Sequence, residues 1–178
     1  MADLFFTSDP HFNHNNIIRL CDRPFANTEE MNEKLIENWN QIVGPKDTIY
    51  CLGDFGWQLS PQTLQEIGSK LNGHKHLIVG NHDKSKLHIK SQIWESVEYY
   101  THINYNKRRL ILFHYPIYDF DGAFHKSILL YGHLHSKETV REVNEIHNKK
   151  GFLSYCVGVD LNDYKPINFD EILQKINA

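Results

Sequence analysis

Histidine, aspartate and asparagine side chains occur at five places in the sequence where a short apolar run ends. These residues are Asp9 and His11, Asp54, the run Asn81-His82-Asp83, His114, and the pair His133 and His135. Neutral imidazole and carboxylate suit zinc, iron or manganese, whereas calcium prefers a shell made only of oxygen. One carboxylate can bridge two cations, and two cations about 3.5–4 Å apart can clamp the attacking and leaving oxygens of a phosphoryl displacement. Water that bridges such a pair is acidic enough to attack near neutral pH.

Each motif alone is weak, because Asp-x-His and Gly-Asp pairs also occur in ordinary turns. Gly80 to Asp83 is a stronger signal, since a turn needs the glycine and asparagine but not the histidine and aspartate after them. His133 and His135 are stronger again, because residues two apart in a strand face the same side, although a surface histidine pair is the alternative. All five motifs in order, each after an apolar run, argue against coincidence.

The elements that must position these motifs are strands. Seven apolar, β-branched or aromatic runs predict strands, several of them buried on both faces. They are residues 4–7, 48–52, 76–79, 99–105, 110–113, 128–131 and 153–159. Asn106-Lys107 lies between two of them and predicts a tight hairpin. Because ligands of open α/β sheets collect at the carboxyl ends of strands, five such ends can bring the motifs into one pocket.

Helices are predicted between the early strands. Residues 28–43 carry apolar side chains at helical spacing, and Asn27 with Glu30 resembles a capping box. Ser60-Pro61 opens a second helix, and a third begins at about Asn168. Alternating α and β elements followed by mostly β elements favour an α/β fold with a mixed sheet and at least one antiparallel hairpin.

The length and the charge distribution bound the domain organisation. The 178 residues fit one domain, residues 1–178. The segment from Ser136 to Gly151 is rich in charge and lies outside the predicted elements. We expect it to be solvated and not to form an apolar lid.

Taken together and in order, the five motifs resemble the signature of the calcineurin-like metallophosphoesterase superfamily. The matching patterns are Asp9-x-His11, Gly53-Asp54, Gly80-Asn81-His82-Asp83, His114 and Gly132-His133-x-His135. The resemblance extends from about residue 4 to residue 160, and residues 7–25 with His114-Tyr115-Pro116 further resemble small bacterial and phage phosphoesterases of this superfamily. It implies a sandwich of two mixed β-sheets flanked by helices.

The resemblance also implies two divalent metal ions per chain, with manganese as first choice and iron, zinc, nickel or magnesium as alternatives. The implied ligands are Asp9, His11 and His135 for the first ion, Asn81, His114 and His133 for the second, and Asp54 as the bridge. By the same resemblance His82 faces the substrate, stabilises the transition state and protonates the leaving oxygen. Asp83 would hold His82 in orientation, as carboxylates beside imidazoles do.

Three residues near these motifs are candidates for substrate binding. Arg23 can hold a phosphate through a bidentate contact, and a surface salt bridge is the equal alternative. His14 follows the first ligand loop, and Tyr115 follows a ligand directly, where it lines the pocket or packs in the core. Phe55 and Trp57 follow the bridging aspartate, and we favour apolar loop packing over a role in covering the metals or stacking on a base.

The leading function is therefore hydrolysis of small phosphate esters. Phosphodiesters are favoured over phosphomonoesters by analogy with small members of the superfamily, since the chain is too short for the insertions that cap larger members. A non-catalytic scaffold of the same fold is the alternative from a different class, although such proteins usually lose ligands. A nuclease acting on polymers is disfavoured, because the net charge of −3 and the lack of a basic stripe argue against tight duplex binding.

Other features of the sequence bear on membrane contact and on the location of the protein. No apolar run is long enough to span a membrane, and no secretory leader is present, so we expect no membrane partner. The three cysteines cannot all pair with one another, and none lies in a CxxC motif. We therefore expect free thiols and a cytoplasmic location. The oligomeric state stays undetermined.

Overall fold

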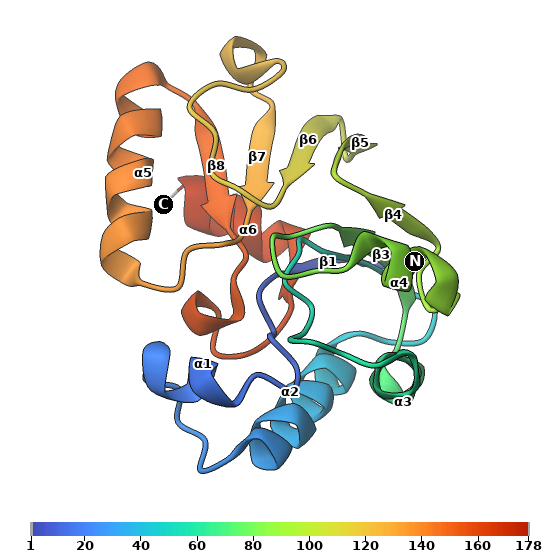
Figure 1. Ribbon diagram of the computed structural model, residues 1–178. Helices are drawn as coiled ribbons and strands as arrows, with labels where there is room; N and C mark the ends of the chain where they lie inside the picture. Colours follow the sequence, from blue (N-terminus) through green and yellow to red (C-terminus); the bar gives the residue numbers. More distant parts are fainter. Residues whose placement is uncertain (1, 178) are drawn as a thin grey trace.

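The computed structural model describes residues 2–177, whose strands form two mixed sheets between layers of helices (Figure 1). The first sheet has the order β4-β3-β2-β1-β9, with β9 antiparallel to its neighbour and the others parallel. Its strands are β1 (Leu4–Thr7), β2 (Thr48–Cys51), β3 (His74–Ile78), β4 (Ser96–Glu98) and β9 (Ile167–Asn168). The second sheet has the order β5-β6-β7-β8, with only β5 antiparallel. Its strands are β5 (Tyr100–Tyr105), β6 (Arg108–Phe113), β7 (Ile128–Tyr131) and β8 (Leu153–Cys156).

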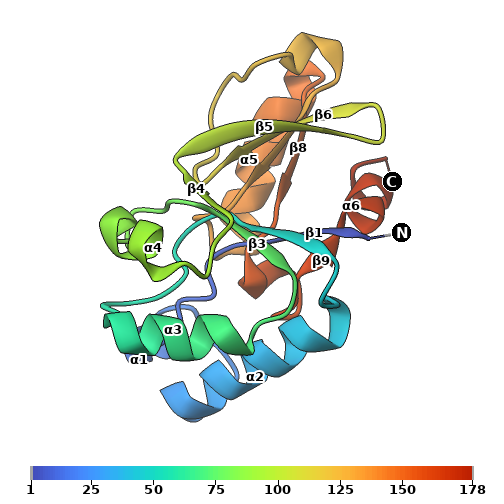
Figure 2. The same cartoon turned by 90° about the vertical axis from the view of Figure 1, so that its right-hand side faces the viewer.

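The helices flank the two sheets, which confirms the predicted fold class. They are α1 (Asn15–Leu20), α2 (Thr28–Ile42), α3 (Pro61–Lys70), α4 (Ser85–Ser91), α5 (Lys137–Lys150) and α6 (Phe169–Asn177), with short 3₁₀ turns at Ala123–His125 and Val159–Leu161. Helices α2 and α3 lie side by side below β1 and β3, while β5, β6 and β8 lie above them (Figure 2). None of the helices within residues 2–177 combines the length and apolar content needed to cross a membrane.

The alternating side chains of β1 divide between two hydrophobic cores. Phe5 packs into the core that includes Trp39 of α2. Phe6 faces the opposite way and joins Leu112 of β6 in the core between the sheets. Burial of each such side chain contributes roughly 1.5–3 kcal/mol. Both faces of this strand are therefore apolar, and the residues directly after it are the first polar groups to reach the sheet edge.

The predicted caps and hairpin are confirmed. The Asn27 side chain accepts the Glu30 backbone N–H at 2.9 Å, and the Ser60 side chain accepts the Thr63 N–H at 3.1 Å. The Glu30 carboxylate accepts from the N–H of Ala26 rather than from that of Asn27, so the capping box is displaced by one residue. Asn106 and Lys107 join β5 to β6 with φ of 46° and 62°, as a two-residue hairpin with left-handed central residues requires.

Residues 136–151 were placed outside the predicted elements but form helix α5; most of its side chains are exposed, as expected of a solvated segment. Its N-terminus is capped by the Ser136 side chain, and Gly151 ends it with φ of 72°. Val140 and Val143, three residues apart, pack against the core on the outer face of the second sheet. The many charged residues around these two valines hid a narrow apolar stripe. Helices α1 and α4 and strands β4 and β9 were likewise not predicted.

The carboxyl ends of strands from both sheets meet near one point. Ser8, directly after β1, forms a parallel bridge with Gly158, two residues after β8. Because β1 and β8 belong to different sheets, this bridge joins their edges. The motifs after β1, β2 and β3 therefore face those after β6 and β7.

Candidate metal centre

Two groups of three side chains gather at the joined edges of the sheets. The ligand atoms of Asp9, His11 and His135 all lie within 4.8 Å of one another, and so do those of Asp54, His114 and His133. These six residues come from loops after β1, β2, β6 and β7. The structure thus brings together all six aspartates and histidines that the resemblance implies as ligands.

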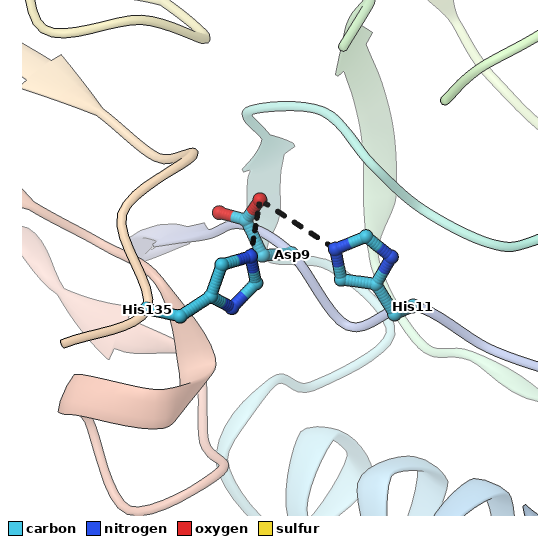
Figure 3. Close-up of side chains that lie close together, drawn as sticks. All are labelled: Asp9, His11 and His135. Carbon is cyan, nitrogen blue, oxygen red and sulfur yellow. Dashed lines mark ion pairs between the residues drawn. The ribbon is translucent and has the colours of Figure 1, made fainter. Parts of the chain in front are cut away.

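Asp9 lies fully buried between two of the histidines. Its Oδ2 accepts the backbone N–H of His133 at 2.8 Å. Its Oδ1 lies 4.0 Å from Nε2 of His11 and 3.9 Å from Nε2 of His135. Figure 3 shows both rings directing a nitrogen at this one oxygen. One Asp9 oxygen therefore fixes a neighbouring loop, and the other faces two imidazoles.

The two carboxylate oxygens of Asp54 also have different partners, and one of them lies near imidazoles of both groups. Its Oδ1 accepts the backbone N–H of His82 at 2.8 Å. Its Oδ2 lies 3.7 Å from Nε2 of His11 and 3.6 Å from Nε2 of His114. Since His11 belongs to one group and His114 to the other, Asp54 stands between the two candidate positions.

His114 and Asn81 present lone pairs to each other. Nδ1 of His114 donates to the carbonyl oxygen of Leu52 at 2.7 Å, which leaves a lone pair on Nε2. That Nε2 lies 3.0 Å from Oδ1 of Asn81, and the Tyr115 hydroxyl donates to the same Oδ1 at 3.3 Å. A metal ion between these two atoms would bind the lone pairs of both.

The residues fit a divalent metal pair by a further test. Within residues 2–177, Oδ1 of Asp9 and Nε2 of His11 are buried side-chain atoms with no hydrogen-bond partner. An unsatisfied buried acceptor costs about 1–3 kcal/mol, and more when it is charged. Metals about 2.0–2.2 Å from each ligand hold neighbouring ligand atoms some 3–4 Å apart, which is the range found here. The donor set of imidazole, carboxylate and amide oxygen suits manganese, iron or zinc.

The backbone carries strain at four of the candidate ligands. Asp9, His11, Asp54 and His133 have φ of 58°, 51°, 52° and 68°, in the left-handed region that non-glycine residues seldom adopt. Such conformations cost about 1–3 kcal/mol each and cluster at functional sites. The glycines of the motifs have a steric reason, since a Cβ on Gly80 would overlap Asp54 and one on Gly132 would overlap Ser8.

Burial and neighbouring charges separate the proton affinities of these groups. Burial raises the pKa of Asp9 to about 6. Burial, helped by the positive charge of Arg23, lowers the pKa of His11 to about 2. Burial opposes protonation of His135, yet its hydrogen bonds to Asp160 and Cys21 and the nearby carboxylates raise its pKa to about 10. His11 is thus a neutral imidazole near pH 7, whereas His135 carries a proton when no metal competes for it.

His82 lies at the mouth of the site. Its side chain is 36% exposed, against 2% for His11, and its Nε2 is 3.9 Å from Oδ2 of Asp54. The Trp57 ring lies 4.8 Å from the His82 ring. His82 is therefore the imidazole that incoming molecules can reach most easily.

His14, a predicted candidate for substrate binding, lies behind His11. Its Nδ1 is 3.3 Å from Nδ1 of His11, and its ring stacks on Trp57 at 4.3 Å. The side chain is mostly buried. In this position His14 can accept a hydrogen bond from Nδ1 of His11. The His11 ring then keeps its proton on Nδ1 and directs the lone pair of Nε2 at the carboxylates.

Asp83 does not lie where the resemblance places it. Its carboxylate accepts the backbone N–H groups of Asp54, Gly80 and Phe55 at 2.8, 2.9 and 3.0 Å. Nε2 of His88 lies 3.4 Å from the same carboxylate. Within residues 2–177, none of the hydrogen bonds or ion pairs of Asp83 goes to His82. Asp83 therefore holds the loops that carry the site rather than the orientation of the His82 ring.

Both interpretations of Arg23 need correction. The guanidinium is fully buried and is bonded to Asp160, to the carbonyls of Asp9 and Pro10, and more weakly to the sulfur of Met31. These contacts use all five N–H donors of the side chain. No donor is left for a phosphate, and the ion pair is not on the surface.

The three other aromatic candidates differ in position. Trp57, for which apolar loop packing was favoured, is instead only partly buried and stacks on His14 at 4.3 Å. The Tyr115 ring lies 4.8 Å from the rings of both His114 and His133, so it flanks the site and is not part of the core. Phe55 is fully buried and packs on Phe12 at 5.0 Å, as apolar loop packing predicts.

Two buried residues near the site were not predicted. Asp160 accepts from Nδ1 of His135 at 2.8 Å and pairs with Arg23. The sequence did offer a signal for Asp160, because it follows the last predicted strand directly, as the five motifs follow theirs. The other is His88, whose Nε2 lies 3.4 Å from Asp83, and no sequence feature ties these two residues together.

Comparisons with known proteins agree with this geometry. A sequence model of the calcineurin-like phosphoesterase family matches residues 3–169. An uncharacterized protein of Methanocaldococcus jannaschii is 36% identical over 99% of this chain and 92% of its own length. The gene 66 protein of a Mycobacterium phage is 27% identical over 99% of this chain and 97% of its own. The crystal structure of an Aquifex aeolicus protein of unknown function superposes with a TM-score of 0.79 at 30% identity, covering 99% of this chain and 100% of that one.

Proposed function

The chain belongs to the calcineurin-like phosphoesterase family, and on this premise we propose that it hydrolyses phosphate esters, small phosphodiesters above all, with two divalent metal ions. The observation that carries the proposal is the pair of buried, unpartnered acceptors Oδ1 of Asp9 and Nε2 of His11. Lone pairs directed at one another inside a protein are stable when a cation lies between them. We take manganese as the first choice for that cation.

The chain's own residues divide the work of holding the ions. Asp9, His11 and His135 would hold the first ion, and Asn81, His114 and His133 the second. Asp54 would contact both, because its Oδ2 lies within 3.7 Å of an imidazole from each group. When bound, the ions would supply Lewis acidity to a phosphate and would lower the pKa of a water molecule.

His82 would act on the substrate directly. It is exposed at the mouth of the site, with its Nε2 3.9 Å from Oδ2 of Asp54. A protonated imidazole there can donate a hydrogen bond to the charged phosphate oxygens and then a proton to the leaving oxygen.

The surroundings favour small substrates. Arg23 is fully committed to buried partners, so it contributes no arginine clamp for the phosphate. Recognition would then depend chiefly on the ions and His82, which bind the phosphate and not the rest of the molecule. Duplex DNA would bind weakly, because it needs many cationic contacts along its backbone, and the net charge is −3.

The test is a set of rate measurements with and without metal. Manganese-loaded protein should hydrolyse a small aryl phosphodiester faster than the matching monoester, and faster than duplex DNA at physiological salt. Chelation should abolish the activity, and manganese should restore it. Undiminished hydrolysis in protein shown to be metal-free would contradict the proposal, and a strong preference for the monoester would reverse the order of the two substrate classes.

A further inference from the structure

Asp160, a residue outside both groups of candidate ligands, contacts one of their members directly. It lies in the turn Val159–Leu161 after β8, and its Oδ2 accepts from Nδ1 of His135 at 2.8 Å. The Asp160 side chain is 5% exposed and that of His135 is 24% exposed. The hydrogen bond therefore holds the His135 ring at Nδ1, although the ring is partly exposed.

Asp160 is itself held rigidly by Arg23. Nε and one terminal nitrogen of the guanidinium donate to the two Asp160 oxygens, both at 2.8 Å. The terminal nitrogens also donate to the carbonyls of Asp9 at 2.8 Å and Pro10 at 2.9 Å. Arg23 thus ties the loop that carries Asp9 to the turn that carries Asp160. A bidentate pair of this kind fixes direction as well as distance.

The hydrogen bond selects one orientation and one tautomer of the His135 ring. A neutral imidazole that donates from Nδ1 keeps its lone pair on Nε2. That Nε2 lies 3.9 Å from Oδ1 of Asp9, one of the unpartnered buried acceptors. A ring flipped by half a turn would direct carbon at Asp9 and lose the bond to Asp160.

We propose that Asp160 is a positioning residue for the first metal ion, because it holds His135 in the only orientation and tautomer that can coordinate beside Asp9. This inference rests on the proposed function, since it needs a metal at that position. Carboxylates that orient metal-binding histidines typically change metal affinity by 10–100-fold when they are mutated.

A direct ligand role for Asp160 is the competing interpretation. Cys21, His135 and Asp160 also offer ligand atoms within 4.8 Å of one another. A metal bound there would have to compete with Arg23 for the Asp160 carboxylate and take Nδ1 of His135. The intact ion pair therefore favours support of His135 over coordination.

The deciding variant is Asp160→Asn. The single oxygen of the new amide should stay with the buried Arg23, so that its N–H groups face His135. The amide would then donate to Nδ1 and stabilise the tautomer with its proton on Nε2, which cannot bind metal. Manganese titration of the whole chain should show that the affinity for one of the two ions falls by roughly 10–100-fold, while the affinity for the other is unchanged. The unchanged ion also reports that the variant is folded.

A double-mutant cycle separates support from coordination. If Asp160 acts through His135, adding Asp160→Asn to His135→Ala should not lower the affinity for the first ion any further. Additive losses would overturn the proposal in favour of direct coordination, and an unchanged affinity in the single variant would overturn it outright. Asp163→Asn, the same change at an exposed position three residues away, should match the wild type.

Two further outcomes are distinguishable from these. Wild-type protein that binds fewer than two manganese ions would contradict the proposed function itself, whatever the variant does. If Asp160→Asn does not fold, Asp160→Glu keeps the charge beside Arg23 and displaces the carboxylate by one methylene. It should give an intermediate loss at the first ion, and wild-type affinity in Asp160→Glu would then count against the proposal.

Discussion

Asp83 and His88 form a buried pair beneath the site, with Nε2 of His88 3.4 Å from Oδ1 of Asp83. The Trp94 indole donates to Nδ1 of His88 at 3.1 Å, so His88 carries its own proton on Nε2 and directs it at Asp83. Asp83 in turn accepts the backbone N–H of Asp54 at 2.8 Å. A chain of polar contacts therefore leads from a core tryptophan to the candidate bridging residue.

Asp83→Asn should loosen both metal ions, because Asp83 holds the backbone of Asp54 and Asp54 faces both groups. The amide can accept only part of the three backbone N–H bonds, and each bond lost to a charged group costs roughly 1.5–3 kcal/mol. The midpoint of urea unfolding should fall accordingly, while Asp163→Asn should leave it unchanged. Normal metal content together with a loss of kcat equal to that of His82→Ala would restore the interpretation in which Asp83 orients His82.

Asp54→Ala should disturb both ions, whereas His135→Ala should mainly loosen the first. The reason is that Oδ2 of Asp54 lies close to His11 and to His114, while Nε2 of His135 faces Asp9 alone among the candidate carboxylates. Metal analysis after dialysis gives the ion count per chain for each variant. An Asp54→Ala protein with two ions and the wild-type rate would remove the bridging role.

His82→Ala should keep both ions and lower kcat by roughly 100- to 10,000-fold if lost proton donation is the main effect. The loss should shrink for nitrophenyl esters, whose leaving group needs little protonation. Rates on a series of leaving groups with rising pKa measure this dependence. An equal loss throughout the series would assign His82 to charge stabilisation alone, and loss of metal would mean that it is a ligand.

Metal binding near neutral pH should release about one proton per chain. Metal-free His135, with its pKa raised to about 10, is protonated there, and it must lose that proton to coordinate through Nε2. His11, whose pKa lies at about 2, contributes none. The apparent affinity for the first ion should therefore rise as the pH rises toward 10, and fall further below about 6, where Asp9 also gains a proton.

Calorimetric titration with manganese in two buffers of different ionisation enthalpy counts this proton. The difference between the two heats should disappear in His135→Ala. Equal heats for the wild type in both buffers would show that His135 is neutral before the metal binds.

Local signals in the sequence determined the strands and the chemistry at their ends. The run Leu4–Thr7 is strand β1 at its predicted bounds, and Ile128–Tyr131 is β7. Strand hydrophobicity is a local property, and so is a ligand motif with its glycine, because neighbours in the chain carry the whole pattern. Helix α5 was missed because its local signal is weak. Val140 and Val143 form a narrow apolar stripe among many charged residues.

What only the tertiary structure decided is which side chains support the ligands. Arg23 and Asp160 stand 137 positions apart, yet they form one buried ion pair. Asp54 and Asp83 are 29 apart, and only the packing of β2 beside β3 brings the carboxylate of one to the backbone of the other. Such contacts leave no periodicity in the chain, because they depend on strand order and on two sheet edges meeting at Ser8 and Gly158. The ligands could therefore be named from the sequence, whereas the groups that orient them became visible only in the folded chain.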